Sequence, residues 1–369
     1  MTHVETTATI DQPAMRPRLG FHVTNRCQRD CDHCLRDPSQ APVDLRLDVA
    51  AMAIAFGRAE FDTTHVSLTG GEPTLHPEFV GLIDLVAGAG MTWDMVTNGE
   101  RFAEVLAHLD EVPSRVTALR SLSLSMDGAT EATHDGIRGP GSFRAVMAAA
   151  SICAVRGIPF GLQMTIHRRN VDELERLGLD AALLGAKHVS FAMMQPTGTA
   201  LDQGLALSPD EWRQVHHRIE RLASVLRITV VAPEGHFRAT VEPLCGPLRG
   251  ETIHVDVHGR LSLCCLQSDV PTSDASHDRT VLGPVTTASG PREAAELLSL
   301  RSTASDSLRE HWDSSERGRW RGFSCNTCLA LSGKPHWTDG GVGGGQADRE
   351  RWRGAWAPAK KRPHLRVLP

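Results

Sequence analysis

The chain has 369 residues, of which 41% are hydrophobic and 22% are charged. This size fits one large and one smaller domain with a sizeable core, which excludes a disulfide mini-protein, a fibre and a disordered chain. The 39 Lys and Arg against 44 Asp and Glu give a net charge of -5, so we expect neither nucleic acid nor membrane as a partner. No apolar run approaches the ~18 residues that span a bilayer, and the N-terminus lacks the pattern of a signal peptide, so we expect a cytoplasmic protein.

Short apolar runs alternate with helical patterns from residue 18 to about residue 200. This order predicts an α/β fold in which six β/α units form a partial, TIM-like (β/α)6 barrel over residues 18–200. The expected strands are Leu19–Thr24, His65–Thr69, Thr92–Thr97, Ser121–Met126, Phe160–Ile166 and His188–Met194. The expected helices include Val43–Phe61, Pro77–Ala89, Ser142–Arg156 and Val171–Gly185.

The pattern changes on either side of this barrel. Residues 1–17 are expected to be an N-terminal extension. Ser208 and Glu211 form a capping box around Pro209, which predicts a linker helix within residues 201–240. Residues 241–339 hold short strand-like pieces, a polar loop over Gln267–Pro291 and a helix near Arg292–Leu300. We expect cysteines, more than a large apolar core, to hold this small domain together. The Gly-rich and then basic tail over residues 340–369 is expected to be disordered.

Nine cysteines in a chain without an export signal favour metal or redox chemistry over disulfides. Cys27, Cys31 and Cys34 form the pattern CxxxCxxC directly after the first strand. Three thiolates on one loop can hold three irons of a 4Fe-4S cluster, and the fourth iron then stays open to a ligand or substrate. A zinc site completed by His33 or His22 is the alternative.

The barrel region resembles the radical S-adenosylmethionine (SAM) superfamily, whose signature is CxxxCxxC after the first barrel strand. The stretch Gly70-Gly71-Glu72-Pro73 at the end of the second strand looks like the GGEP motif of that family. Two glycines let the backbone approach a ligand, and a carboxylate can accept a hydrogen bond from an ammonium group. The resemblance therefore implies that the three cysteines hold a SAM-binding 4Fe-4S cluster and that this motif contacts the methionine amino group of SAM.

Further polar residues at successive strand ends match the same family. The resemblance implies that Arg138, in the HDxxRG stretch that begins at His134, clamps the SAM carboxylate through two hydrogen bonds. The other SAM contacts that it implies are Asn98, Ser123, Ser125, Asp127, Thr165, Gln195 and Gln163, which replaces the usual asparagine. It also implies an external electron donor such as flavodoxin or ferredoxin, and cleavage of SAM to a 5′-deoxyadenosyl radical that abstracts a substrate hydrogen.

A second cysteine group lies in the C-terminal part. Cys245, Gly259 and Cys264, followed by a CxxC pair, resemble the twitch domain, a one-cluster relative of the SPASM domain. The resemblance implies one auxiliary 4Fe-4S cluster for electron transfer, held by Cys245, Cys264, Cys325 and Cys328. A four-cysteine zinc site is the alternative.

Two cysteines remain outside both groups. Cys153 and Cys265 are candidate hydrogen donors to a substrate radical. For Cys153, inside an Ala-rich helix, the favoured interpretation is a small buried hydrophobic residue.

We therefore expect a radical SAM enzyme that oxidises or epimerises a small molecule, such as a sugar, an aminocyclitol or another natural-product intermediate. The main alternative is a peptide-modifying enzyme that forms a thioether or carbon-carbon crosslink. Many such enzymes carry a leader-binding module before the barrel, and only about twenty residues precede the first strand here. A noncatalytic iron-sulfur electron carrier or zinc scaffold is the alternative from another class, but it would leave the GGEP and HDxxRG residues without a role.

Overall fold

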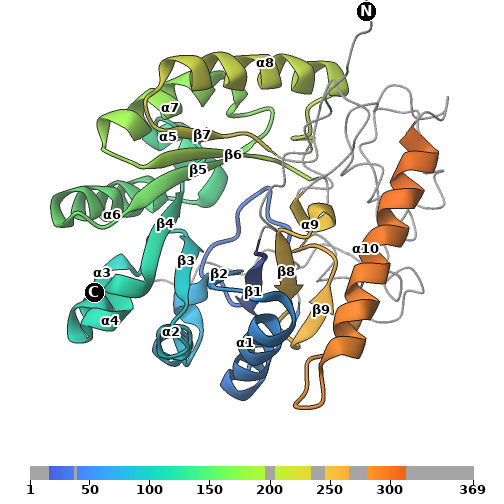
Figure 1. Cartoon of the computed structure of the whole chain (residues 1–369). Coiled ribbons are helices and arrows are strands. Elements are labelled where there is room, and N and C mark those ends of the chain that lie inside the picture. The colour runs from blue at the N-terminus through green and yellow to red at the C-terminus, as the bar shows by residue number, and fades with distance from the viewer. Residues whose placement is uncertain (1–15, 37–39, 196–203, 234–245, 266–280, 313–369) are drawn as a thin grey trace, which may run out of the picture.

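One mixed sheet organises the computed structural model, which describes residues 16–36, 40–195, 204–233, 246–265 and 281–312. Its strands lie in the order β10-β9-β8-β1-β2-β3-β4-β5-β6-β7. All neighbours from β8 to β7 are parallel, whereas β9 and β10 pair antiparallel (Figure 1). The strands are β1 (Arg18–Thr24), β2 (His65–Gly70), β3 (Thr92–Thr97), β4 (Leu119–Ser125), β5 (Phe160–Ile166), β6 (His188–Met193), β7 (Thr229–Val231), β8 (Thr252–Val255), β9 (Arg260–Ser262) and β10 (Val281–Pro284).

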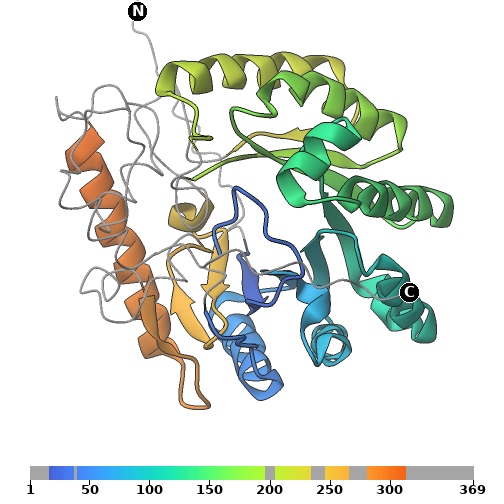
Figure 2. The ribbon, with the colours of Figure 1, turned by 180° about the vertical axis from the view of Figure 1, so that it is seen from behind.

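Helices follow the first six strands and cover the outer face of the curved sheet (Figures 1 and 2). They are α1 (Leu47–Phe61), α2 (Phe79–Gly88), α3 (Phe102–Glu111), α4 (Pro113–Ala118), α5 (Glu131–Arg138), α6 (Ser142–Arg156), α7 (Leu174–Leu183) and α8 (Pro209–Val225), with short 3-10 turns at Pro73–Leu75 and Val171–Glu173. The remaining helices, α9 (Gly246–Arg249) and α10 (Pro291–Trp312), lie beside β8 and β9. This arrangement confirms the predicted partial barrel of six β/α units.

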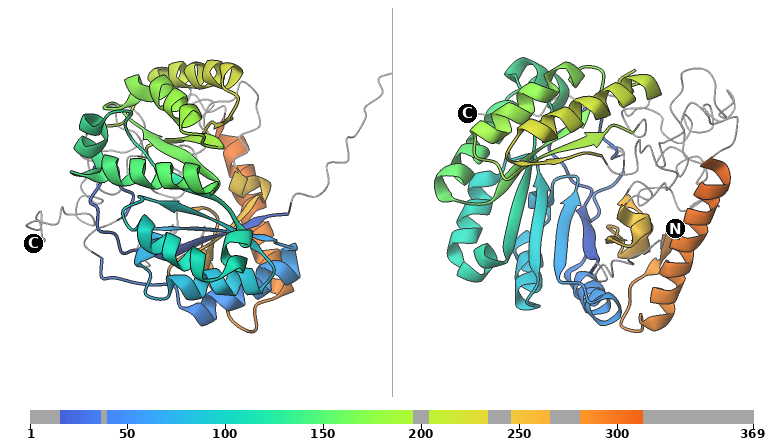
Figure 3. Two further views of the ribbon diagram at one scale, coloured as in Figure 1. Left: turned by 90° about the vertical axis from the view of Figure 1, so that its left-hand side faces the viewer. Right: turned by 45° about the horizontal axis from the view of Figure 1, so that its top comes forward.

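The two faces of the sheet differ in polarity because side chains alternate along each strand. Trp93 and Met95 of β3 are fully buried under the helices, and they belong to the main apolar core. The residue between them, Asp94, faces the inner side and lies 2.7 Å from the Nε2 atom of His65 on β2. The strands also twist along the sheet, as Figure 3 shows.

The C-terminal part of the chain extends the same sheet. β8 pairs in parallel with β1, with Leu19 opposite Ile253 and Phe21 opposite Val255. Ile253, Val255 and Leu297 of α10 belong to the main apolar core. The described part of residues 241–339 is therefore held by the main core as well as by any cysteine ligation.

Two local differences from the sequence-based elements have clear causes. α1 begins at Leu47 rather than Val43, because the residues before it run beside the end of β1, where Asn25 N donates to Val43 O at 3.1 Å. The stretch that contains the HDxxRG residues forms α5, whose start is capped by Thr130. No helix in the described ranges is long and apolar enough to cross a membrane.

Candidate active site

The first cysteine group lies on the loop that leaves the carboxyl end of β1. Cys31 is buried, while Cys27 and Cys34 are partly exposed. The Arg29 backbone N–H donates to Cys27 Sγ at 3.4 Å, which is a contact that suits a thiolate ligand. Burial raises the pKa of Cys27 to about 11 and that of Cys31 to about 12, so both are thiols in the absence of metal. Metal binding at these residues would therefore release protons.

The described residues hold no ready-made site for a single metal ion. No three of their His, Cys, Asp and Glu side chains converge on one point, as the ligands of one zinc would. In a 4Fe-4S cluster each cysteine binds a different iron, so the three thiols do not share one centre.

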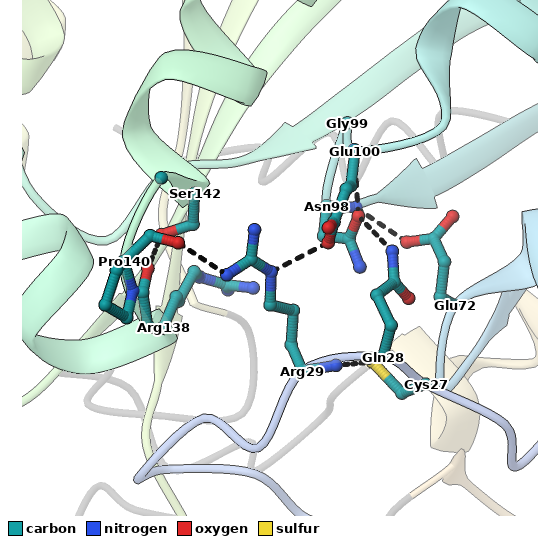
Figure 4. A network of polar contacts seen from close by, with 12 residues as sticks. Cys27, Gln28, Arg29, Glu72, Asn98, Gly99, Glu100, Arg138, Pro140 and Ser142 are labelled. Atoms are coloured by element: carbon teal, nitrogen blue, oxygen red, sulfur yellow. Dashed lines mark hydrogen bonds and ion pairs between the residues drawn. The ribbon is translucent and has the colours of Figure 1, made fainter. Parts of the chain in front are cut away.

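Side chains of the cysteine loop tie it to neighbouring elements. The Arg29 guanidinium donates to Glu100 Oε2 at 2.8 Å and to the Pro140 carbonyl at 3.0 Å, so it bridges two sides of the site (Figure 4). Gln28 Nε2 donates to Asn98 Oδ1 at 3.3 Å. The loop is thereby held against the segments that follow β3 and α5.

The glycines of the GGEP motif are required by contact between two backbone segments. Gly71 N donates to Thr24 O at 2.7 Å, and Glu72 N donates to Arg26 O at 2.7 Å. A Cβ atom on Gly71 would lie 2.7 Å from the Arg26 carbonyl carbon and closer still to its oxygen. Gly70 adopts φ +150° and also packs on Thr24 O. In this structure the glycines therefore bring β2 against the cysteine loop, whereas the sequence suggested an approach to a ligand.

The Glu72 carboxylate lies at the centre of a buried hydrogen-bond network. Its Oε1 accepts from the hydroxyls of Thr74 and Thr97, each at 2.8 Å, and its Oε2 accepts from Asn98 N at 2.8 Å. Burial raises the pKa of Glu72, although these hydrogen bonds oppose that effect. The described contacts thus give Glu72 the role of joining the ends of β2 and β3, and an ammonium group would be a further partner.

Asp127, just beyond β4, forms a second buried centre. Its Oδ1 accepts from Thr165 N at 2.8 Å, while its Oδ2 pairs with Arg138 Nε and lies 3.3 Å from His33 Nε2. Burial alone would raise the pKa of Asp127, but Arg138 and His33 outweigh burial and hold that pKa below its ordinary value. The Asp127 N–H donates to His134 Nδ1 at 3.0 Å.

This arrangement changes the interpretation of the HDxxRG stretch. His134 and Arg138 both hydrogen-bond to Asp127. Asp135 accepts hydrogen bonds from Gly141 N and Phe143 N at the start of α6. The predicted clamp on the SAM carboxylate would have to use the Arg138 nitrogens that Asp127 does not occupy.

Other predicted SAM contacts line successive strand ends. Ser123 Oγ pairs with His188 Nε2 at 3.3 Å, Ser125 is buried, and Gln163 stands opposite Ser125 in the sheet. Thr165 binds Asp127 through its backbone N–H. Pro73 begins a buried 3-10 turn next to Glu72.

Several buried polar atoms at this edge have no hydrogen-bond partner among the described residues. Three of them are Gln195 Oε1 after β6, His167 Nε2 after β5 and His33 Nδ1 on the cysteine loop. Unpaired buried polar atoms are costly and mark a place where a ligand can complete them. They fit a polar cofactor at the carboxyl edge. Sequence reasoning predicted Gln195, weighed His33 only as a zinc ligand and missed His167, which no motif marks.

The second cysteine group is only partly described. Cys245, Cys325 and Cys328 lie outside the described residues. Cys264 follows β9 at the end of a β8–β9 hairpin whose turn contains Gly259 at φ +76°. A side chain on Gly259 would overlap Val49 of α1. The glycine between Cys245 and Cys264 therefore sets both the turn and its packing.

The two extra cysteines have different surroundings. Cys153 is 0% exposed within the main apolar core on α6, and burial raises its pKa to about 12. Cys265 is exposed next to Cys264. This placement favours the apolar interpretation of Cys153 over a role as hydrogen donor.

Fold and site together define an enzyme of the parallel partial-barrel class, with its polar site at the carboxyl ends of the strands. The model of the radical SAM superfamily matches residues 21–181. The AdoMet-dependent heme synthase of Methanosarcina barkeri is 30% identical over 251 residues, which cover 66% of this chain and 69% of that protein. The chain therefore belongs to the radical SAM superfamily, whose enzymes use a 4Fe-4S cluster and SAM.

Two further comparisons concern proteins whose names mention peptides. The PqqA peptide cyclase of Ruegeria pomeroyi is 32% identical over 194 residues, 51% of this chain, and the chain spans only 50% of that relative's length. The structure of anSMEcpe with bound AdoMet and Kp18Cys peptide matches with a TM-score of 0.60 at 17% identity and covers 88% of this chain and 92% of that chain. This structural likeness shows the fold alone.

Proposed function

We propose that this radical SAM enzyme modifies a peptide by oxidative crosslinking. The observation that carries this proposal is the 32% identity over 194 residues to a peptide cyclase. It favours the peptide-modifying alternative over the small-molecule oxidation or epimerisation that the sequence suggested first. The fold itself can accommodate a peptide beside AdoMet, as in anSMEcpe.

The residues of the site have distinct parts in this proposal. Cys27, Cys31 and Cys34 hold the cluster, and the Glu72 network fixes the adjoining ends of β2 and β3. Gln195 offers an unpaired buried acceptor to the cofactor. When bound, the cluster and SAM supply a 5′-deoxyadenosyl radical that takes a hydrogen atom from the substrate.

The overall balance of a crosslink is the loss of two hydrogen atoms from the peptide. One leaves as a hydrogen atom to the SAM-derived radical, and the other leaves as a proton to solvent and an electron. Cys245, Cys264, Cys325 and Cys328 would hold an auxiliary 4Fe-4S cluster, which would supply an acceptor for this electron before an external carrier removes it. The thioether or carbon-carbon bond then forms within the peptide.

Mass spectrometry tests this proposal directly. The reconstituted enzyme is incubated anaerobically with SAM, dithionite and the synthetic short peptides encoded beside its gene. We expect one peptide to lose two hydrogen atoms and to raise the yield of 5′-deoxyadenosine above the peptide-free background. If no such peptide changes mass or raises that yield, the peptide assignment is wrong.

A small-molecule substrate is a second candidate, because one relative, which this chain spans to 69%, is a heme synthase by name. Stimulation of 5′-deoxyadenosine formation by sugars or aminocyclitols, and not by peptides, would establish this candidate instead.

A further inference from the structure

Asp127 and Arg138 place a positive charge against one of the three cluster cysteines. Arg138 Nη1 lies 4.0 Å from Cys31 Sγ, within hydrogen-bonding range for sulfur. Its Nε pairs with Asp127 Oδ2, which is 0% exposed, and the Arg138 side chain is only 12% exposed. The guanidinium is therefore held in place by a carboxylate on one edge while another edge reaches the sulfur.

Arg138 is the main positive charge that acts on Cys31. The attraction of a Cys31 thiolate to the Arg138 guanidinium is larger than its repulsion by Asp127. The other arginines of the cysteine loop pair with other groups: Arg29 with Glu100 and the Pro140 carbonyl, Arg26 with Asp44, and Arg36 with Asp30 and the Arg29 carbonyl. Arg138 thus reaches a cluster cysteine directly, at Cys31 Sγ.

We propose that Arg138, oriented by Asp127, is a positioning residue that raises the reduction potential of the SAM-binding cluster. A one-electron reduction makes the cluster more negative, so a fixed positive charge and a hydrogen bond to a ligand sulfur stabilise the reduced state more than the oxidised state. Because the site is buried, solvent screens this interaction weakly. The inference needs only the three cysteines and the membership of the superfamily, and it does not depend on the substrate.

A redox titration of the reconstituted full-length protein tests the proposal. The EPR signal of the reduced cluster that changes on addition of SAM identifies the catalytic cluster. Its midpoint potential is then measured both without and with SAM, and the proposal concerns the value without SAM. R138Q should lower the equilibrium constant for one-electron reduction about tenfold, which is a shift of about 59 mV to more negative potential. R138K keeps the charge but loses the planar fork, so it should shift in the same direction by less.

A buried arginine elsewhere serves as the matched control. Arg115 of α4 is 8% exposed at its side chain and pairs with Asp84 of α2 at 2.7 Å and with the His108 carbonyl of α3 at 2.8 Å. R115Q removes the ion pair of a similarly buried arginine, although Asp84 is half-exposed, and it does not touch a cluster cysteine. Its midpoint potential should therefore equal that of the wild type.

Three results would overturn the proposal. The first is an unchanged midpoint potential in R138Q, and the second is an equal shift in R115Q. The third is a shift in R138Q that exists only when SAM is present, because it would place Arg138 on SAM rather than on Cys31. If R138Q does not take up the cluster, the R138K potential decides, and a value equal to that of the wild type refutes the proposal.

Discussion

Gly71 and Arg26 are in backbone contact, although they belong to different motifs of the sequence. The Arg26 carbonyl oxygen accepts a hydrogen bond from Glu72 N at 2.7 Å, and no space remains there for a side chain on Gly71. The cysteine loop and the GGEP turn therefore form one folding unit. A change in either should disturb both.

G71A tests this contact. A methyl group must push the cysteine loop away from β2, and we expect a loss of at least about 3 kcal/mol in the free energy of unfolding, together with reduced iron content. Urea unfolding and iron analysis measure the two effects. G88A is the control, because a Cβ there meets nothing within 4 Å, and it should change stability by less than about 1 kcal/mol. Equal stability of the two variants would contradict the proposed folding unit.

E72Q tests the carboxylate network. The amide NH2 group cannot accept a hydrogen bond, so either the Asn98 N–H or the Thr74 N–H must lose its acceptor. We expect a cost of about 2 kcal/mol and weaker SAM binding, measured by urea unfolding and equilibrium dialysis. E104Q, whose carboxylate is largely exposed on α3, should cost under about 1 kcal/mol. A smaller effect for E72Q than for E104Q would show that the network has no structural role.

His134 should make the stability of the protein depend on pH. Burial lowers its pKa to about 4, and the ring accepts the Asp127 N–H through a bare Nδ1. At pH values below the ordinary histidine pKa near 6.5, His134 binds a proton in the unfolded chain but stays neutral in the folded chain. The free energy of unfolding therefore falls as the pH falls towards 4. Between pH 7 and pH 5 this loss is about 2 kcal/mol. Urea unfolding should show a flatter pH dependence for H134N, whose amide oxygen can still accept the Asp127 N–H. Parallel stability curves for H134N and the wild type would refute His134 as the origin of the pH dependence.

C27A should abolish the formation of 5′-deoxyadenosine from SAM with dithionite. With one of the three loop cysteines gone, the catalytic cluster loses a ligand. C153A is the control, since Cys153 lies in the apolar core away from the polar site, and it should retain the product. Product formation by C27A would remove the cysteine loop from the mechanism.

Iron content should separate the two clusters. Anaerobically reconstituted wild type should bind about eight irons, and C264A should retain about four. C265A, a change at the exposed neighbour, should keep the full content. If the wild type itself holds about four irons, the auxiliary cluster does not exist.

Much of the fold follows from local patterns in the sequence. The strands Thr92–Thr97 and Phe160–Ile166 have the predicted bounds, because alternating burial and β-branched residues mark them. α5 was not predicted, since it is short and polar and its residues matched a ligand motif. The parallel pairing of β8 with β1 joins segments more than 230 residues apart, and no local signal encodes such a contact.

The strand-end positions of the polar residues were predictable from the sequence, whereas their partners within the chain were not. Glu72, Asp127 and Arg138 stay predicted SAM contacts, and in the structure they also bind other parts of the chain. Residue type and strand-end position give the location of a polar group. Its partner depends on which loops the tertiary fold brings within hydrogen-bonding distance.

The pairing of β8 with β1 has a consequence for any attempt to shorten this protein. Cutting the chain before residue 246 would remove β8, which pairs with β1, the strand that leads into Cys27. One edge of β1 would then expose unpaired backbone beside hydrophobic Leu19 and Phe21. A truncated barrel should then aggregate or lose its iron, even though every residue of the first cysteine loop would still be present.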